Sequence, residues 1–298
     1  MAYKCSCCGV ESEVEQAFAK VRIGINYDFC CPTCLEKRNI ENFKVSLIWY
    51  FLAGVIGFAL WMVKPTQPEG KILLGVFSLI FFLFPLITFH ELAHAITAHI
   101  LGLRVFAIHV GYGKIVYSTY LGKIAISLRS LPIGGLTYIS APMLPFYQLR
   151  FAITYLAGPF IHLVIFLGMG PLWLQMRGTS GLDRSLVYLL LTNWLISNLV
   201  ILVANLIPHR VATPHGQIQS DGGQIWSALF RRPKNMENRL ASYYIMEAAE
   251  SARQDRLADA ERWIGQGLAQ YPTNPLMLNT AGYVLFQAGQ WDQARQVW

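Results

Sequence analysis

The chain has 298 residues, of which 54% are hydrophobic and only 14% are charged. Soluble domains average about 25% charged residues, so the composition excludes an ordinary soluble or disordered protein and favours a membrane protein. The net charge is +7, and the excess lies in residues 45–208, which carry nine basic and three acidic residues. Neither flank has the dense basic face that phosphate binding requires, so no nucleic-acid partner is expected.

The first 44 residues contain all six cysteines. Two CxxC pairs, Cys5 with Cys8 and Cys31 with Cys34, are separated by 22 residues. Two such pairs are typical of a four-cysteine zinc site, so a small zinc-ribbon-like head with a structural zinc ion is predicted. Disulfides are the alternative, and they are less common in a reducing cytoplasm. Cys7 and Cys30 are surplus to this ligand set. The N-terminus lacks a charged segment followed by an apolar run, so no cleaved signal peptide is expected.

Four apolar stretches follow, and each is long enough to cross a bilayer once as a helix. They are Val45–Val63, Ile72–Leu101, Phe151–Met176 and Ser185–Ile207. The segment 102–150 between the second and third stretches carries five basic residues and no acidic one. Basic loops lie on the cytoplasmic side, so four spans would place this segment and both termini in the cytoplasm.

The basic segment 102–150 is not helical in pattern. Its runs of β-branched and aromatic residues, such as Val105–His109, are broken by glycines. Short strands in a membrane-associated hairpin are predicted, with a bend at Ser130–Leu136, although a plain surface hairpin fits the same pattern. An exposed strand edge there could bind an unwound substrate by β-addition.

The polar segment after residue 230 begins with a basic linker and then takes a helical spacing. Arg256–Ala260 matches Gln290–Ala294 at a shift of 34 residues, the period of the tetratricopeptide repeat. Residues 231–298 therefore resemble a linker followed by tetratricopeptide-like repeats, the last of them incomplete. A generic pair of helical hairpins is the alternative.

The motif that carries chemistry is His90-Glu-Leu-Ala-His94, within the second apolar stretch. Residues four apart share one helix face, so both imidazoles can bind one zinc ion while Glu91 acts as general base toward its water. Ionisable groups at membrane depth are costly and are rarely kept without a function. A structural role, in which these side chains only bond to neighbouring helices, is the less favoured reading.

A catalytic zinc ion usually has three protein ligands, so a third is needed from elsewhere in the chain. Asp221 is the best candidate, because it is the only acidic residue between Asp183 and Glu237 and it follows the fourth apolar stretch. An ordinary Asp-Gly surface turn is the alternative.

Residues 45–230 resemble the site-2 protease family, the intramembrane zinc metalloproteases. The resemblance rests on the His90–His94 motif in a span, the paired glycines at 134 and 135, and the elements Ala157-Gly-Pro159, Asn205-Leu-Ile-Pro208 and Asp221-Gly-Gly223.

This resemblance implies that His90, His94 and Asp221 hold the catalytic zinc ion and that Glu91 is the catalytic base. It also implies a role for Asn205 in holding the substrate or the developing oxyanion, and substrate contacts at Gly134 and Gly135. Two features depart from the family pattern. Residues His209–Gln219 are inserted before Asp221, and His162 stands where an asparagine often follows the Ala-Gly-Pro element.

The sequence thus predicts a mainly α multi-pass membrane protein of three parts, 1–44, 45–230 and 231–298. The predicted activity is that of a zinc endopeptidase, with Glu91 activating a zinc-bound water to cleave membrane-anchored proteins in or near their spans. Cytoplasmic partners could bind the head and the repeats, and deleting residues 240–298 would alter substrate choice more than intrinsic hydrolysis. The alternative is a non-proteolytic membrane scaffold of the same fold.

Overall fold

The computed structural model describes residues 3–4, 11–12, 19–23, 26–30, 52, 54–63, 68–179, 185–213, 216–230, 233–254 and 256–297. In the head, β1 (Tyr3–Lys4) pairs with β2 (Glu11–Ser12), and β3 (Ala19–Ile23) pairs with β4 (Asn26–Cys30). Both pairs are antiparallel. The four cysteines of the predicted zinc site, Cys5, Cys8, Cys31 and Cys34, lie outside the described residues.

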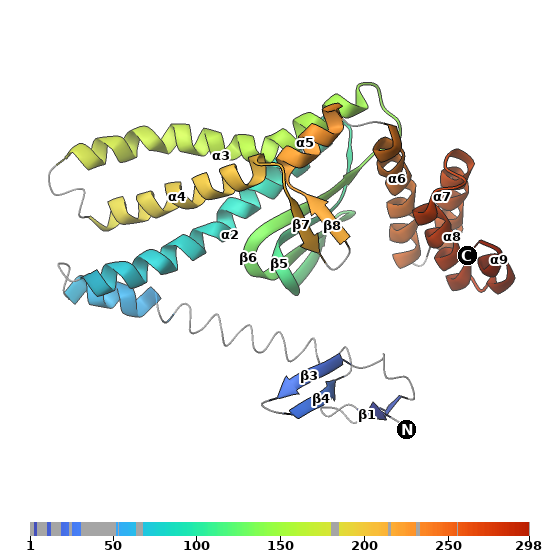
Figure 1. Ribbon diagram of the computed structural model, residues 1–298, viewed down its shortest axis with the longest axis horizontal. Coiled ribbons are helices and arrows are strands. Elements are labelled where there is room, and N and C mark those ends of the chain that lie inside the picture. The colour runs from blue at the N-terminus through green and yellow to red at the C-terminus, as the bar shows by residue number, and fades with distance from the viewer. Residues whose placement is uncertain are drawn as a thin grey trace.

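Three long helices lie side by side and form the membrane part (Figure 1). They are α2 (Pro68–Ile100), α3 (Tyr147–Gly178) and α4 (Leu186–Leu206). Among the described residues, these are the helices long and apolar enough to cross a bilayer. The first of the four predicted spans is described mainly as the short apolar helix Gly54–Val63, so a fourth span stays a prediction.

The three long helices bury polar side chains and expose apolar ones, the reverse of a soluble protein. Asn193 of α4 donates to Ser78 Oγ of α2 at 2.6 Å, and Ser197 donates to the Leu79 carbonyl at 3.2 Å. Exposed apolar residues on α2 include Val76, Ile80, Phe81, Phe89, Leu92 and Ile96. Polar residues that face the inside of a bundle while apolar residues face outward fit a lipid environment, where interhelical hydrogen bonds replace contacts with water.

The segment after α2 forms two long strands, β5 (Arg104–Leu121) and β6 (Ile124–Ser140), instead of the short strands predicted. Residues 107–110 pair with both 125–128 and 135–138, so this part of β5 lies between two parts of β6, and the register along the pair is irregular. The expected bend falls in this irregular region, where Gly134 has φ 65°. The second half of β6 therefore returns alongside the start of β5, next to α2.

A small hairpin and a short helix follow α4. The hairpin consists of β7 (Arg210–Thr213) and β8 (Gly216–Gln219), and it occupies most of the predicted insertion 209–219. The Ser220 hydroxyl links the two ends of this hairpin, since its Oγ accepts from the His209 N–H and donates to the Ile207 carbonyl. The chain thereby returns to the end of α4 before α5 (Asp221–Phe230) begins.

The described part of the C-terminal region consists of helices joined by short turns. It contains α6 (Pro233–Arg253), α7 (Leu257–Gln270), α8 (Pro275–Gln287) and α9 (Trp291–Val297). Helices α6, α7 and α8 share an apolar cluster around Tyr244, Ile264 and Met277. Assignment of these helices to tetratricopeptide repeats stays a prediction.

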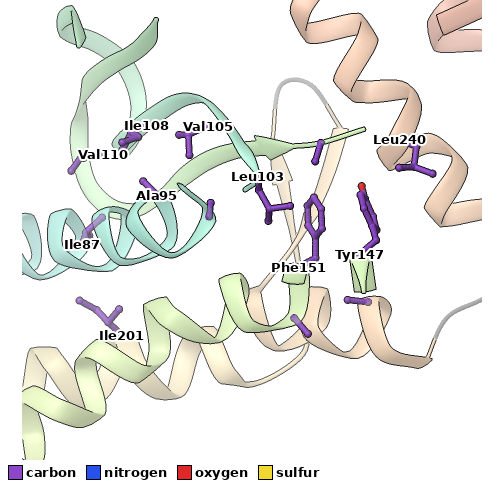
Figure 2. Packing of buried hydrophobic residues seen from close by; sticks show 14 of the residues in the cluster. Ile87, Ala95, Leu103, Val105, Ile108, Val110, Tyr147, Phe151, Ile201 and Leu240 are labelled. Carbon is purple, nitrogen blue, oxygen red and sulfur yellow. The ribbon is translucent and has the colours of Figure 1, made fainter. Parts of the chain in front are cut away.

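The main apolar core lies at the end of the membrane bundle where α2, α3, the β5–β6 hairpin and α6 meet (Figure 2). It includes Ala95 of α2, Val105 of β5, Phe151 of α3 and Leu240 of α6. Helix α6 is therefore packed into the same core as the helices that carry the site.

Candidate metal centre

Three potential ligand atoms converge between α2 and the start of α5. His90 Nε2 lies 2.9 Å from Asp221 Oδ2 and 3.0 Å from His94 Nε2, and His94 Nε2 lies 3.3 Å from the same carboxylate oxygen. His90 and His94 are each only 4% exposed. Side chains 131 residues apart in the chain are therefore brought into one buried cluster.

Helix geometry accounts for two of these positions, and close helix packing accounts for the third. His90 and His94 are four residues apart on α2 and so project from one face. Asp221 is the first residue of α5, and the next residue, Gly222, lies against the Leu206 carbonyl at the end of α4. A Cβ at Gly222 would collide with this carbonyl oxygen, so glycine is required for α5 to bring Asp221 toward α2.

The second nitrogen of each imidazole is already engaged. His94 Nδ1 lies 2.7 Å from the Thr154 carbonyl oxygen, which can only accept, so Nδ1 carries the proton. His90 Nδ1 lies 3.1 Å from His162 Nε2. In a neutral His94 the Nε2 lone pair then points at His90 Nε2 and at the carboxylate of Asp221. A cation among these electron-rich atoms, whether a proton or a metal ion, would relieve their repulsion.

The donor set fits a zinc ion. Tetrahedral zinc with bonds of about 2.0–2.1 Å separates its ligands by about 3.3 Å, close to the distances between these three atoms. Burial alone would raise the pKa of Asp221, but the adjacent His94 and His90 outweigh burial and hold that pKa below its usual range. That direction reflects positive charge on the histidines, and a bound cation would favour the charged carboxylate in the same way. Two histidines and one carboxylate leave the fourth position of a catalytic site open.

The Glu91 side chain contacts strand β6. Thr137 Oγ1 is 2.6 Å from Glu91 Oε2 and 3.2 Å from the Glu91 carbonyl oxygen, so the hydroxyl can donate to either. A Cβ at Gly135 would collide with Oε1 and would lie 2.7 Å from the carboxyl carbon. The hairpin thus holds the Glu91 carboxyl group by one hydrogen bond and one close steric contact.

Gly158 makes room for both imidazoles. A Cβ at this position on α3 would lie 2.6 Å from His90 Nε2 and would collide with His94 Nε2. Because a real Cβ is essentially never closer than 3.0 Å to such atoms, any larger residue would displace the two rings.

The other residues predicted from the sequence are placed as follows. Asn205 Nδ2 donates to the Ile201 carbonyl of its own helix at 2.9 Å, and a Cβ at Gly134 would meet nothing within 4 Å. The substrate roles of Asn205, Gly134 and Gly135 stay predictions. His209 is exposed and its Nδ1 lies 2.9 Å from the Ile207 carbonyl oxygen.

Three features of the site could not be assigned from the sequence. Gly158 was visible only as part of the Ala-Gly-Pro element, and Thr137 carried no signal of its own. His162 stood out as a polar residue in a span, but nothing in the sequence indicated that it contacts His90.

Comparison with known proteins supports this chemistry over part of the chain. Residues 78–178 match the model of Peptidase family M50, the site-2 protease family. The matched segment includes His90, Glu91 and His94, and peptidases of this family are zinc-dependent. Together with the three apolar helices, the match supports an integral membrane metalloprotease. Searches of curated proteins and of solved structures gave no match.

Replacing Gly158 with alanine should weaken metal binding by at least about tenfold, the scale at which residues around a metal site act, because the new Cβ would push both imidazoles apart. Zinc affinity can be measured by chelator competition on the full chain. Gly168→Ala is the matched control, since it lies on the same helix with open space around its Cβ position. Equal affinities for the two variants would contradict the steric role of Gly158.

Replacing Gly135 with alanine should lower kcat while zinc stays bound, because the Cβ would displace Glu91 and not the metal ligands. Displacement of a catalytic group by about 1 Å costs on the order of 10²-fold in rate. Gly122→Asn, at the hairpin turn with φ 60° and open space, controls for effects on hairpin folding. Since the added Cβ strikes Glu91 directly, a lost activity here would not by itself demonstrate a substrate contact at Gly135.

Proposed function

We propose that this protein is an intramembrane zinc endopeptidase that cleaves peptide bonds in or near the spans of membrane-anchored proteins. The observation that carries the proposal is the convergence of His90, His94 and Asp221 within a bundle of helices long enough to cross a bilayer, with Glu91 next to the first ligand. The family match over residues 78–178 supports the same reaction class.

In this proposal a bound zinc ion would supply Lewis-acid activation of water and of the substrate carbonyl group. Glu91 would take the proton from that water and later deliver it to the leaving amine. Thr137 would hold the carboxylate by donating to Oε2, so that Oε1 stays available to the water. Asn205 would hold the substrate or the developing oxyanion, as the family resemblance implies.

The β5–β6 hairpin is the proposed docking edge for the substrate. A helical span hides its carbonyl groups in hydrogen bonds and must unwind before hydrolysis, and an added strand can replace the lost bonds. Residues 135–138 of β6 pair with 107–110 and include both residues that touch Glu91. A substrate strand on this part of the hairpin would therefore lie close to the proposed base.

The site is proposed to face the cytoplasm, with both termini on that side. The hairpin, α5 and α6 gather at the same end of the helix bundle (Figure 1). The segment 102–150 at that end carries five basic residues, and basic segments favour the cytoplasmic side. Water and protons would then reach Glu91 from the cytoplasm.

The Glu91→Gln variant tests the proposal. Glutamine keeps the size of the side chain and its bond from Thr137 but cannot accept the proton, so cleavage should fall by at least about 10²-fold. The full chain in liposomes would be incubated with a panel of single-span peptides, and the products would be mapped by mass spectrometry. Zinc content should be unchanged.

Equal processing by the wild type and Glu91→Gln would contradict the protease assignment. With the fold intact, that outcome would favour the membrane scaffold, in which the head and the C-terminal helices gather partners. The head would then still hold its own structural zinc ion through Cys5, Cys8, Cys31 and Cys34.

Substrate selection is proposed to involve the cytoplasmic parts, namely the zinc-ribbon-like head and the C-terminal helices. Deleting α7–α9 disturbs the main core less than deleting residues 240–298, because Leu240 of α6 belongs to that core. Deleting residues 257–298 should change which peptides of the panel are cleaved while hydrolysis of the best peptide persists. Zinc bound by the His90 site reports whether the core survives. An unchanged order of preference would argue against a selecting role.

A further inference from the structure

His162 and Asn198 form a buried hydrogen-bonded chain that ends on a proposed metal ligand. His162 lies on α3 and Asn198 on α4, and neither side chain is exposed. His162 Nδ1 lies 2.7 Å from Asn198 Oδ1, and His162 Nε2 lies 3.1 Å from His90 Nδ1. The chain therefore connects all three long helices.

The orientation of the Asn198 amide fixes the first proton in this chain. Its Nδ2 donates to the His162 carbonyl oxygen at 2.7 Å. A flipped amide would place its oxygen against that carbonyl, and two acceptors would then face each other. The amide oxygen must consequently face His162 Nδ1, so Nδ1 is the nitrogen that carries the proton.

The remaining protons follow from this one. A neutral imidazole has a single N–H, so His162 Nε2 presents a lone pair to His90. His90 Nδ1 must then carry a proton and donate it, which leaves Nε2 of a neutral His90 unprotonated. This is the nitrogen that faces Asp221 Oδ2 and His94 Nε2. In the opposite tautomer, His90 Nε2 would carry a proton and could not bind a metal ion.

We propose that His162 and Asn198 are positioning residues that hold His90 in its metal-binding tautomer, a role that rests on the proposed zinc site. His94 needs no such chain, because the Thr154 carbonyl can only accept. An imidazole can accept or donate, so His162 depends on Asn198 to fix its direction. Asn198 thereby acts on a ligand of α2 that it does not contact directly.

Zinc affinity of the full chain, measured by chelator competition in the inactive Glu91→Gln background, tests this role without any need for activity. His162→Leu removes the acceptor and should weaken zinc binding about 10- to 100-fold, the usual cost of losing a partner of a metal-bound histidine. His162→Gln can place its amide oxygen where Nε2 now lies and should restore most of the affinity. His162→Asn is polar but too short to reach His90, and it should bind zinc as weakly as the leucine variant.

Asn198→Leu should also weaken zinc binding, but it should add little in a chain that already carries His162→Leu, because Asn198 acts through His162. Two results would each overturn the proposal: unchanged affinity in His162→Leu, or equal affinities for the glutamine and asparagine variants. A full additional loss in the double variant would overturn the role of Asn198. If His162→Leu does not fold, the comparison of glutamine with asparagine still decides the question.

His94→Ala supplies the reference for zinc bound elsewhere, including any at the cysteines of the head. If the Glu91→Gln parent holds no more zinc than His94→Ala, the metal site itself fails, and the role of His162 fails with it. A zinc site that His94→Ala abolishes but His162→Leu leaves unaltered would overturn only the positioning role.

Discussion

The structure depends on the close approach of His90, His94 and Asp221 in a setting with little water. Each atom at the centre of this cluster is electron-rich, and the second nitrogen of each imidazole is already engaged. A cation bound among the three atoms would offset their mutual repulsion. The surrounding features follow from this constraint. Gly158 leaves space for the two imidazole rings, and Gly222 lets α5 approach the end of α4 closely. Hydrogen-bond partners on α3 orient the rings of His90 and His94.

The proposed base is controlled from a different part of the chain than the ligands. The proposed ligands are oriented by α3 and α5, whereas the Glu91 carboxyl group is held by Thr137 and confined by Gly135 on β6. The hairpin that is proposed to receive the substrate is thus the same element that fixes the base. A substrate strand that shifted this part of β6 would therefore also shift the Glu91 carboxyl group.

Local patterns predicted much of the fold and part of the site. The lengths of the apolar stretches predicted the ends of three helices to within a few residues. The four-residue spacing of His90 and His94 predicted that both lie on one helix face. Asp221 was singled out because acidic residues are scarce near it. Gly158, Thr137 and His162 act through contacts between elements far apart in sequence, and no local pattern records such contacts. The predicted strands were too short because the glycines within β5 were interpreted as strand ends. In the structure these glycines lie inside the irregular β5–β6 pair.

Helix α6 connects the C-terminal helices to the metal centre by two routes. The Arg239 guanidinium lies over the rings of Phe151 and Tyr155 on α3, and Tyr155 packs edge-on against His94. The same guanidinium donates to Gln224 on α5, the helix that begins with Asp221. One side chain of α6 therefore touches both helices that surround the ligands. Arg239 is half-buried, and its contacts with α3 and α5 join the C-terminal helices to the two helices beside the candidate metal centre.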